Sequence, residues 1–195
     1  MLFRSAKAHG HGDTATLVRL AQAAQAAALA IIERRGNGER VATLRREMAQ
    51  TMEDGCGIYR SADTMQATCN KLAELKVRYR TVQVDDHSRG WNTEWLLTIE
   101  LGYLLDVAQA MAHSALARRE SRGSHQRLDG FEARDDINFL QHSLATYAGD
   151  AAPVISYGPV KITSSQPGTR AYGAAGEQAD ADRQAVQSTQ ETAHG

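Results

Sequence analysis

The sequence predicts a mainly α fold: a three-helix bundle of the spectrin-repeat kind with one long helix, followed by a small β-hairpin and a disordered C-terminal tail. Three observations carry this prediction. Only three prolines occur in 195 residues, so long helices can run without interruption. Apolar residues recur at helical spacing from residue 39 onward. After about residue 164 large apolar residues almost disappear, and we expect residues 173–195 to form the tail.

The composition is that of a globular domain, with 42% hydrophobic and 23% charged residues. A net charge of −1 gives no general reason to expect nucleic acid or an anionic membrane surface as a partner. Cys56 and Cys69 form no CxxC pair, so we interpret them as small buried residues in a reducing compartment. No stretch approaches the roughly 18 uninterrupted apolar residues that span a bilayer, and no signal peptide is visible, so we expect a cytoplasmic chain.

Residues 1–38 are expected to form an N-terminal helical remnant and linker. His9, His11 and Asp13 alternate and could chelate a metal if the segment were held, but the glycines beside them favour a linker. Residues 14–35 are rich in alanine, a strong helix former, and Asp13 is a candidate N-cap. The Gly-Asn-Gly sequence that follows is expected to end this helix.

Two shorter helices are predicted next, over residues 39–54 and from about residue 61 to residue 78. Their apolar faces consist of Val41, Leu44, Met48, Met52, Met65, Cys69, Leu72 and Leu75. Ser61 or Asp63 can cap the second helix. The methionines are interpreted as core residues rather than as metal or redox ligands. The sequence Gly-Cys-Gly at 55–57 is expected to break the first helix.

The dominant predicted element is a long helix from Asn92 to Gly123. Asn92 can cap it, and Glu94 lies in the first turn, where the helix dipole favours a negative charge. A run of roughly 29 residues is about 43 Å long at the standard rise per residue. Such a helix either forms the spine of a bundle or lies along a partner.

A loop and a hairpin are expected after the long helix. Residues 124–139 are polar, with a single helical turn starting near Asp135. Residues 140–147 and 154–162 have the composition of two short strands joined by a turn-rich loop. Pro159 confines the second strand to a sheet edge.

No complete catalytic site is visible in the sequence. It contains no GxGxxG or GxxxxGKS/T phosphate loop, and no G-x-S-x-G, H-E-x-x-H or CxxC motif. His113 lies near the apolar face of the long helix and is interpreted as a packing residue rather than a base. His142 lies in a predicted strand and has no carboxylate partner in the sequence. We therefore expect no catalytic, cofactor-binding or metal-binding residue in this chain.

One cluster of charged residues stands out where the long helix ends, and we predict from it an interface network of ion pairs. Its members are Arg118, Arg119, Arg122, His125, Arg127 and Asp129. In an extended segment, the last three of these side chains point the same way. Cations in a last helical turn also offset the dipole, with Gly123 as a left-handed cap. Contact with an anion and simple solvation remain alternatives.

Four blocks of the sequence, all within residues 39–172, carry a family resemblance. They are MEDGCGIYRS, NTEWLLTIELGYLLDVAQAMAHSALARRESRGSHQRLD, RDDINFLQHSLATY and VKIT. In order and spacing they resemble the flavoprotein subunits of fumarate reductase and succinate dehydrogenase and, more loosely, L-aspartate oxidase. The residues of these blocks are more similar to those of bacterial fumarate reductase. Several blocks in register are a specific signal, whereas SRGxH alone would not be.

The resemblance implies a part of an FAD-dependent oxidoreductase, namely its C-terminal helical domain over residues 39–172, without the FAD-binding and capping domains. In that family the flavin and dicarboxylate sites precede the matched region, so FAD is expected in the parent subunit and none in this chain. The implied partners are the FAD-binding domain of the same subunit and an iron–sulfur subunit. The membrane is reached only indirectly through anchor subunits, at its cytoplasmic face, and no nucleic acid is implied. The alternatives are a free-standing helical interaction module and the equivalent domain of L-aspartate oxidase.

Overall fold

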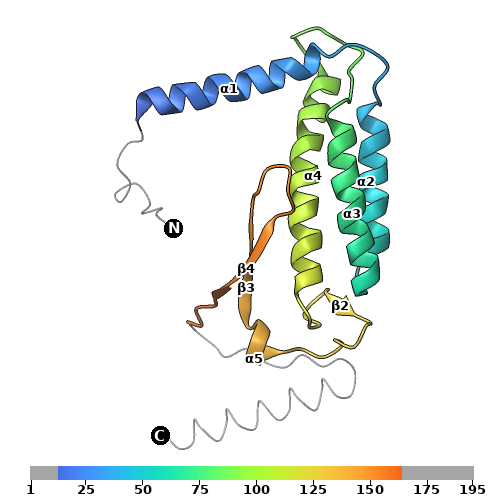
Figure 1. The fold of residues 1–195 in the computed structure, drawn as a ribbon, viewed down its shortest axis with the longest axis vertical. Helices are drawn as coiled ribbons and strands as arrows, with labels where there is room; N and C mark the ends of the chain where they lie inside the picture. The colour runs from blue at the N-terminus through green and yellow to red at the C-terminus, as the bar shows by residue number, and fades with distance from the viewer. Residues whose placement is uncertain (1–12, 164–195) are drawn as a thin grey trace, which may run out of the picture. The chain divides into compact units, whose positions relative to one another are not determined.

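The computed structural model describes residues 13–163, and its main feature is a bundle of three helices that lie side by side (Figure 1). The elements are α1 (Thr14–Ile32), α2 (Val41–Cys56), β1 (Tyr59–Arg60), α3 (Ala62–Tyr79), α4 (Thr93–Ala117), β2 (Gln126–Arg127), α5 (Asp136–Phe139), β3 (Gln141–Thr146) and β4 (Val154–Pro159). Helices α2, α3 and α4 form the bundle, so the mainly α prediction is confirmed. Of the described residues, 13–159 belong to one compact unit. The predicted tail at 173–195 and the two histidines before Asp13 lie outside the described residues.

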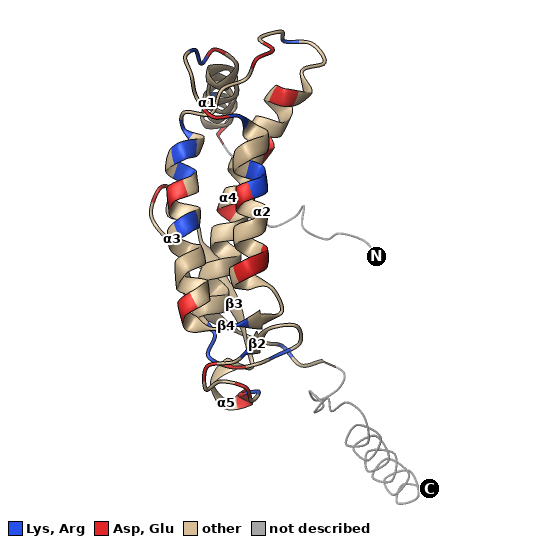
Figure 2. Ribbon diagram, turned by 90° about the vertical axis from the view of Figure 1, so that its right-hand side faces the viewer, with Lys and Arg blue, Asp and Glu red and all other residues tan. Residues whose placement is uncertain are grey.

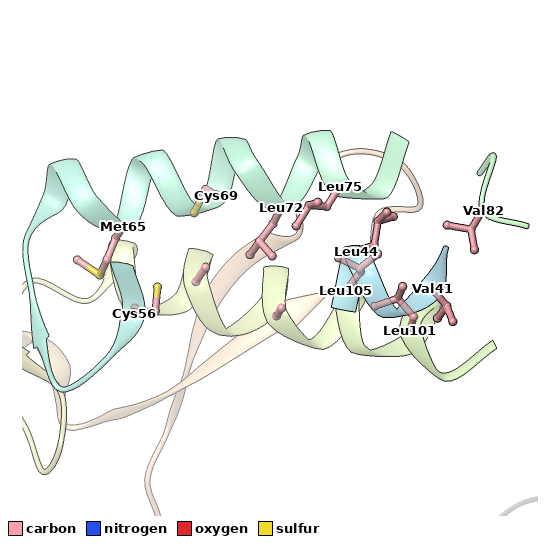
Figure 3. Close-up of a cluster of buried hydrophobic side chains, with 13 residues drawn as sticks. Val41, Leu44, Cys56, Met65, Cys69, Leu72, Leu75, Val82, Leu101 and Leu105 are labelled. Atoms are coloured by element: carbon pink, nitrogen blue, oxygen red, sulfur yellow. The ribbon is translucent and has the colours of Figure 1, made fainter. Parts of the chain in front are cut away.

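The core lies between the three bundle helices (Figure 3), and the apolar faces predicted for α2 and α3 contribute to it. The core face of α4 differs from the expected one: Leu101, Leu105 and Ala112 are buried, whereas the stripe from Leu96 through Tyr103 and Val107 to Met111 is exposed. The most deeply buried members of the core are Leu44, Met65, Leu72, Leu75, Val82, Leu101, Leu105 and Ala112. Burying each leucine stabilises the fold by roughly 1.5–3 kcal/mol. Cys56 and Cys69 are also buried, as predicted, and burial raises the pKa of the Cys69 thiol to about 11. Both thiols are therefore packing groups at neutral pH.

The starts of the bundle helices follow from side-chain caps. Ser61 rather than Asp63 caps α3: its hydroxyl accepts from the Thr64 backbone N–H at 3.3 Å, and the Thr64 hydroxyl accepts from the Ser61 N–H at 3.2 Å. Asn92 caps α4, as predicted, because its side-chain oxygen accepts from the Trp95 N–H at 2.8 Å.

The predicted break at residues 55–57 is confirmed, but Gly55 itself is still helical: α2 ends at Cys56, with Gly57 as its C-cap. A Cβ atom on Gly55 would lie 1.8 Å from the Thr68 hydroxyl oxygen and 2.9 Å from the Thr64 carbonyl oxygen. The glycine is therefore needed for the close approach of α3 to α2, and it does not end the helix.

The predicted end of the long helix is wrong, since α4 has 25 residues and ends at Ala117. Arg118 already has an extended backbone, with ψ at 104°, and no cation lies in the last turn of α4. The arginines therefore do not lie in the last turn as expected, although Arg127 from β2 donates to the carbonyl oxygens of Leu116 at 3.4 Å and Arg118 at 3.1 Å at the end of α4. Gly123, with φ at +60°, serves a tight turn in which Arg122 and His125 exchange backbone hydrogen bonds of 2.9 and 3.1 Å.

Of the two short sheets in the described region, one was predicted from sequence and the other was not. β3 and β4 form the predicted antiparallel hairpin, with Gln141 opposite Pro159 and Thr146 opposite Val154. β1 and β2 form a parallel pair of two residues each, which the sequence analysis missed. This small pair joins the start of α3 to the segment that follows α4.

α1 is held to the bundle only near its C-terminal end. Ile31 and Ile32 are buried with Val84, and the Trp95 indole N–H donates to the Ala28 carbonyl oxygen at 2.8 Å. By length and composition α1 could cross a bilayer: 18 of its residues have a mean hydropathy of 1.5, and 11% of this window is buried. No membrane-spanning segment was expected here because Arg19 and two glutamines interrupt the apolar run. An exposed helix that another polypeptide covers would have the same features.

Candidate interaction site

The predicted charged residues lie at the end of the bundle where β2 and α5 meet the last turn of α4 (Figure 1). Five of the six are joined to one another or to residues from distant parts of the chain, through contacts described below. Arg119 is the exception, and its side chain is exposed. The arrangement therefore divides into an internal network and one outward cation.

The internal network is centred on Glu120, which is completely buried. Its carboxylate accepts from Arg118 Nη1, from Arg122 Nε at 2.8 Å and Nη2 at 2.9 Å, and from the Asp135 backbone N–H at 2.9 Å. Burial alone would raise the pKa of Glu120, but these hydrogen bonds lower it below its ordinary value. A buried carboxylate is therefore held charged by two guanidinium groups and a backbone donor.

Arg118 ties the end of α4 to the hairpin. Its guanidinium donates to the carbonyl oxygens of Phe139 at 2.9 Å and Gln141 at 2.6 Å, and to the Ser143 hydroxyl at 3.2 Å. The Phe139 ring lies 5.5 Å from the guanidinium carbon, within the range of a cation–π contact. One arginine thus fixes the first residues of β3 against the end of α4.

Arg127 and Asp129 form a second pair that reaches α3. Arg127 is 2% exposed and binds the Asp129 carboxylate through two hydrogen bonds of 2.8 and 2.6 Å. The same carboxylate accepts from the backbone N–H of Ala62, the first residue of α3. Both contacts lower the pKa of Asp129, with the Arg127 hydrogen bonds as the larger cause. The pair therefore links the segment after α4 to the start of α3.

His125 lies between two arginines. Its Nδ1 is 2.8 Å from Arg60 Nη1, and its Nε2 is 3.2 Å from the Arg118 carbonyl oxygen. Because Arg60 can only donate, Nδ1 accepts, and Nε2 carries the proton that it donates to the carbonyl. Burial, and then the charges of the surrounding arginines, lower the pKa of His125, so the imidazole is neutral at pH 7.

The burial pattern follows the alternation seen in the sequence. His125 and Arg127 are buried and Asp129 is half-buried, whereas Leu128 between the last two is 63% exposed. The sequence analysis did not select Glu120, although it lies within the same run of charges. Arg60 is 65 positions from His125, and nothing in the sequence connects them.

The described residues do not fit a flavin site. Over 13–163 the two sheets have two strands each, and no strand leads through a glycine-rich turn into a helix that could approach a pyrophosphate. His113 is half-buried on α4, with its pKa lowered by burial, and His142 is exposed on β3. The arrangement offers packing, ion pairing and contact surface.

Comparison with known proteins gives a consistent result. Residues 45–172 match the family model described as fumarate reductase flavoprotein C-term. The fumarate reductase flavoprotein subunit of Haemophilus influenzae is 51% identical over 155 residues, which are 80% of this chain and 26% of that subunit. The succinate dehydrogenase flavoprotein subunit of Rickettsia bellii is 34% identical over 124 residues, which are 64% of this chain and 21% of that subunit.

A solved structure has the same fold. The Escherichia coli quinol fumarate reductase flavoprotein is similar with a TM-score of 0.76 at 46% identity, over 82% of this chain and 27% of that one. The chain thus spans about a quarter of the length of these relatives. Identity is higher to the fumarate reductase subunit than to the succinate dehydrogenase subunit, as the sequence blocks indicate. The chain belongs to the family of fumarate reductase flavoprotein C-terminal domains.

Proposed function

We propose that this chain serves as the C-terminal helical domain of a fumarate reductase flavoprotein subunit. It gives structural support and contact surface, and FAD and the groups that react with fumarate or succinate belong to the rest of that subunit. The described residues support this division because they offer ion pairs and packing surfaces but no dinucleotide cradle.

The observation that carries the proposal is an apolar stripe on the outer face of α4. The stripe consists of Leu96, Tyr103, Leu104, Val107 and Met111, which are between 36% and 68% exposed. α4 contains no lysine or arginine, whereas charged residues line α3 (Figure 2). Exposed apolar patches on a folded domain usually mark contact surfaces. The occupant that we infer for this stripe is the FAD-binding part of the same subunit.

The further partners that we infer are an iron–sulfur subunit and, only through anchor subunits, the membrane at its cytoplasmic face. Relatives that extend far beyond the matched region support the FAD-binding part of the same subunit as the partner inferred above, since they provide the rest of a flavoprotein subunit. The quinol fumarate reductase among the similar structures supports a parent complex that exchanges electrons with a quinol. No nucleic acid is inferred as a partner.

A chimera tests the proposal. Residues 45–172 of this chain would replace the matched region of the Escherichia coli flavoprotein subunit, and assembly would be followed by gel filtration and flavin absorbance. We expect a folded, flavin-containing subunit. Val107→Glu in the stripe should reduce its yield at least tenfold, whereas Val77→Glu on α3 should leave it unchanged, because Val77 is equally exposed, at 59% against 55% for Val107.

Two results would contradict the proposal. Failure of the unsubstituted chimera to assemble, with the chain itself folded, would favour a free-standing interaction module. Equal effects of the two valine substitutions would show that the stripe is not the contact surface.

A further inference from the structure

We propose that Arg119 and His113, at a cleft between α4 and the β3–β4 hairpin, form a second interaction surface that receives a carboxylate-bearing apolar segment of a partner polypeptide. The partner's identity rests on the proposed function, whereas the chemistry of the surface does not.

Arg119 is the member of the cluster whose charge is not used by any other residue that the structure describes. Over residues 13–163, Arg118 and Arg122 share Glu120, and Arg127 is paired with Asp129. No hydrogen bond or ion pair within this range involves the Arg119 guanidinium. An unpaired guanidinium on a rigid segment can bind a partner's carboxylate without first breaking an internal ion pair.

The cleft beside Arg119 is large and is lined in part by aromatic rings. Its volume is about 940 Å³, and it lies between α3, α4, the loop after β2 and β4. Phe131, Phe139 and Tyr157 line it, and the last two rings meet edge to face at a centroid distance of 5.7 Å. Ile137 on α5, 93% exposed, and Leu128 after β2, 63% exposed, are further exposed apolar side chains in this part of the chain. An open apolar surface of this kind fits a polypeptide segment.

The charges around the cleft are complementary to an acid. Among the described residues that line it there is no carboxylate, and they include His113, Arg119 and Arg127. Asp129, which binds the lining residue Arg127, also accepts from the start of α3, so its charge is already used. His113 has no charged partner within the described chain, and burial alone lowers its pKa. A carboxylate placed here therefore meets Arg119 directly and favours the protonated form of His113.

The experiment uses the full chain and a defined probe, the peptide acetyl-Leu-Glu-Phe-Glu-amide, with its Gln counterpart as the neutral control. NMR would follow the His113 ring and the Arg119 side-chain N–H. We expect saturable shifts with the Glu peptide that weaken as salt is added, and at least tenfold weaker binding of the Gln peptide. Arg119→Glu should reduce binding of the Glu peptide at least tenfold. Arg46→Glu, the same charge change at an exposed position on α2, should not.

Equal binding of the two peptides, or no effect of Arg119→Glu, would overturn the proposal. The chimeric subunit then identifies the partner: Arg119→Glu should weaken its assembly with the iron–sulfur subunit or its folding onto the FAD-binding part, and Arg46→Glu should weaken neither. If the unsubstituted chimera fails to assemble, the proposed function fails, and the peptide titration still decides the chemistry of the cleft.

Discussion

The carboxylate of Asp129 caps α3 through the backbone N–H of Ala62, 67 positions earlier in the chain. A helix start is usually satisfied by a residue directly before it, and here Ser61 does so as well. The second cap comes from beyond α4, and Arg127, which binds Asp129, also donates to the Leu116 and Arg118 carbonyl oxygens, so the Arg127–Asp129 pair links the end of α4 to the start of α3.

Asp129→Ala should be strongly destabilising. It removes the cap on α3 and leaves the Arg127 guanidinium, 1% exposed in its side chain, without its anion. Removing one partner of a buried ion pair costs about 3–5 kcal/mol. We expect a loss of that order in the free energy of unfolding, measured with urea. Asp63→Ala, in the first turn of the same helix but exposed, should cost much less. Equal losses would show that Asp129 acts only through the helix dipole.

Glu120 should give the fold an acid-sensitive step. Its pKa is lowered in the folded protein, so its contribution is complete above the ordinary value of 4.5 and is lost as the pH falls through the folded-state value. Glu120→Gln should therefore lower stability near neutral pH by about 3 kcal/mol, and the difference from the original chain should shrink below about pH 4.5.

Urea unfolding at pH 7 and at pH 3.5 measures this difference. Glu53→Gln at an exposed position on α2 should leave both values unchanged. Glu47 also has a lowered pKa, of about 2, because Arg78 and Lys71 bind it, and it contributes equally to both proteins being compared. A difference that stays constant with pH would mean that Glu120 is not ionised in the fold.

Lys76 should control the mobility of the hairpin tip. Its ammonium group lies 2.7 Å from Asp106 Oδ1 and donates to the Gly149 carbonyl oxygen at 3.0 Å. We expect Lys76→Ala to speed amide hydrogen exchange across the hairpin loop while exchange in α2 stays unchanged. Arg80→Ala, which removes the exposed pair with Asp150, should have little effect, since exposed pairs contribute little. A larger effect of Arg80→Ala than of Lys76→Ala would show that the exposed Arg80–Asp150 pair anchors the loop.

The bundle could be predicted from sequence because its signals are local. Helical spacing placed Leu44 and Leu72 on apolar faces, and Asn92 marked the start of the long helix. The end of that helix could not be predicted in this way. Good helix formers follow Ala117, but the backbone there is extended because these residues contact distant parts of the chain.

The internal network shows why the candidate site was harder to predict. Arg118 binds carbonyl oxygens more than 20 positions away, and Arg60 meets His125 through a sheet of two residues per strand. Backbone acceptors and such short strands leave no composition signal. The charge cluster was visible as a set, but sequence spacing alone did not separate Arg119 from the arginines that are bound inside the chain.

Shortening one buried side chain near the C-terminal end of α1 should release this helix from the bundle. Ile32 is 2% exposed and packs with Val84 beside Trp95, whereas the rest of α1 is largely exposed. In a Trp91→Phe background Trp95 is the one remaining tryptophan, so its emission reports this contact. Ile32→Ala should shift the emission to longer wavelength and leave urea unfolding of the bundle unchanged, because the lost packing lies outside the main core. Val18→Ala, 50% exposed on the same helix, should do neither, and parallel loss of bundle stability with Ile32→Ala would mean that α1 is part of the cooperative core.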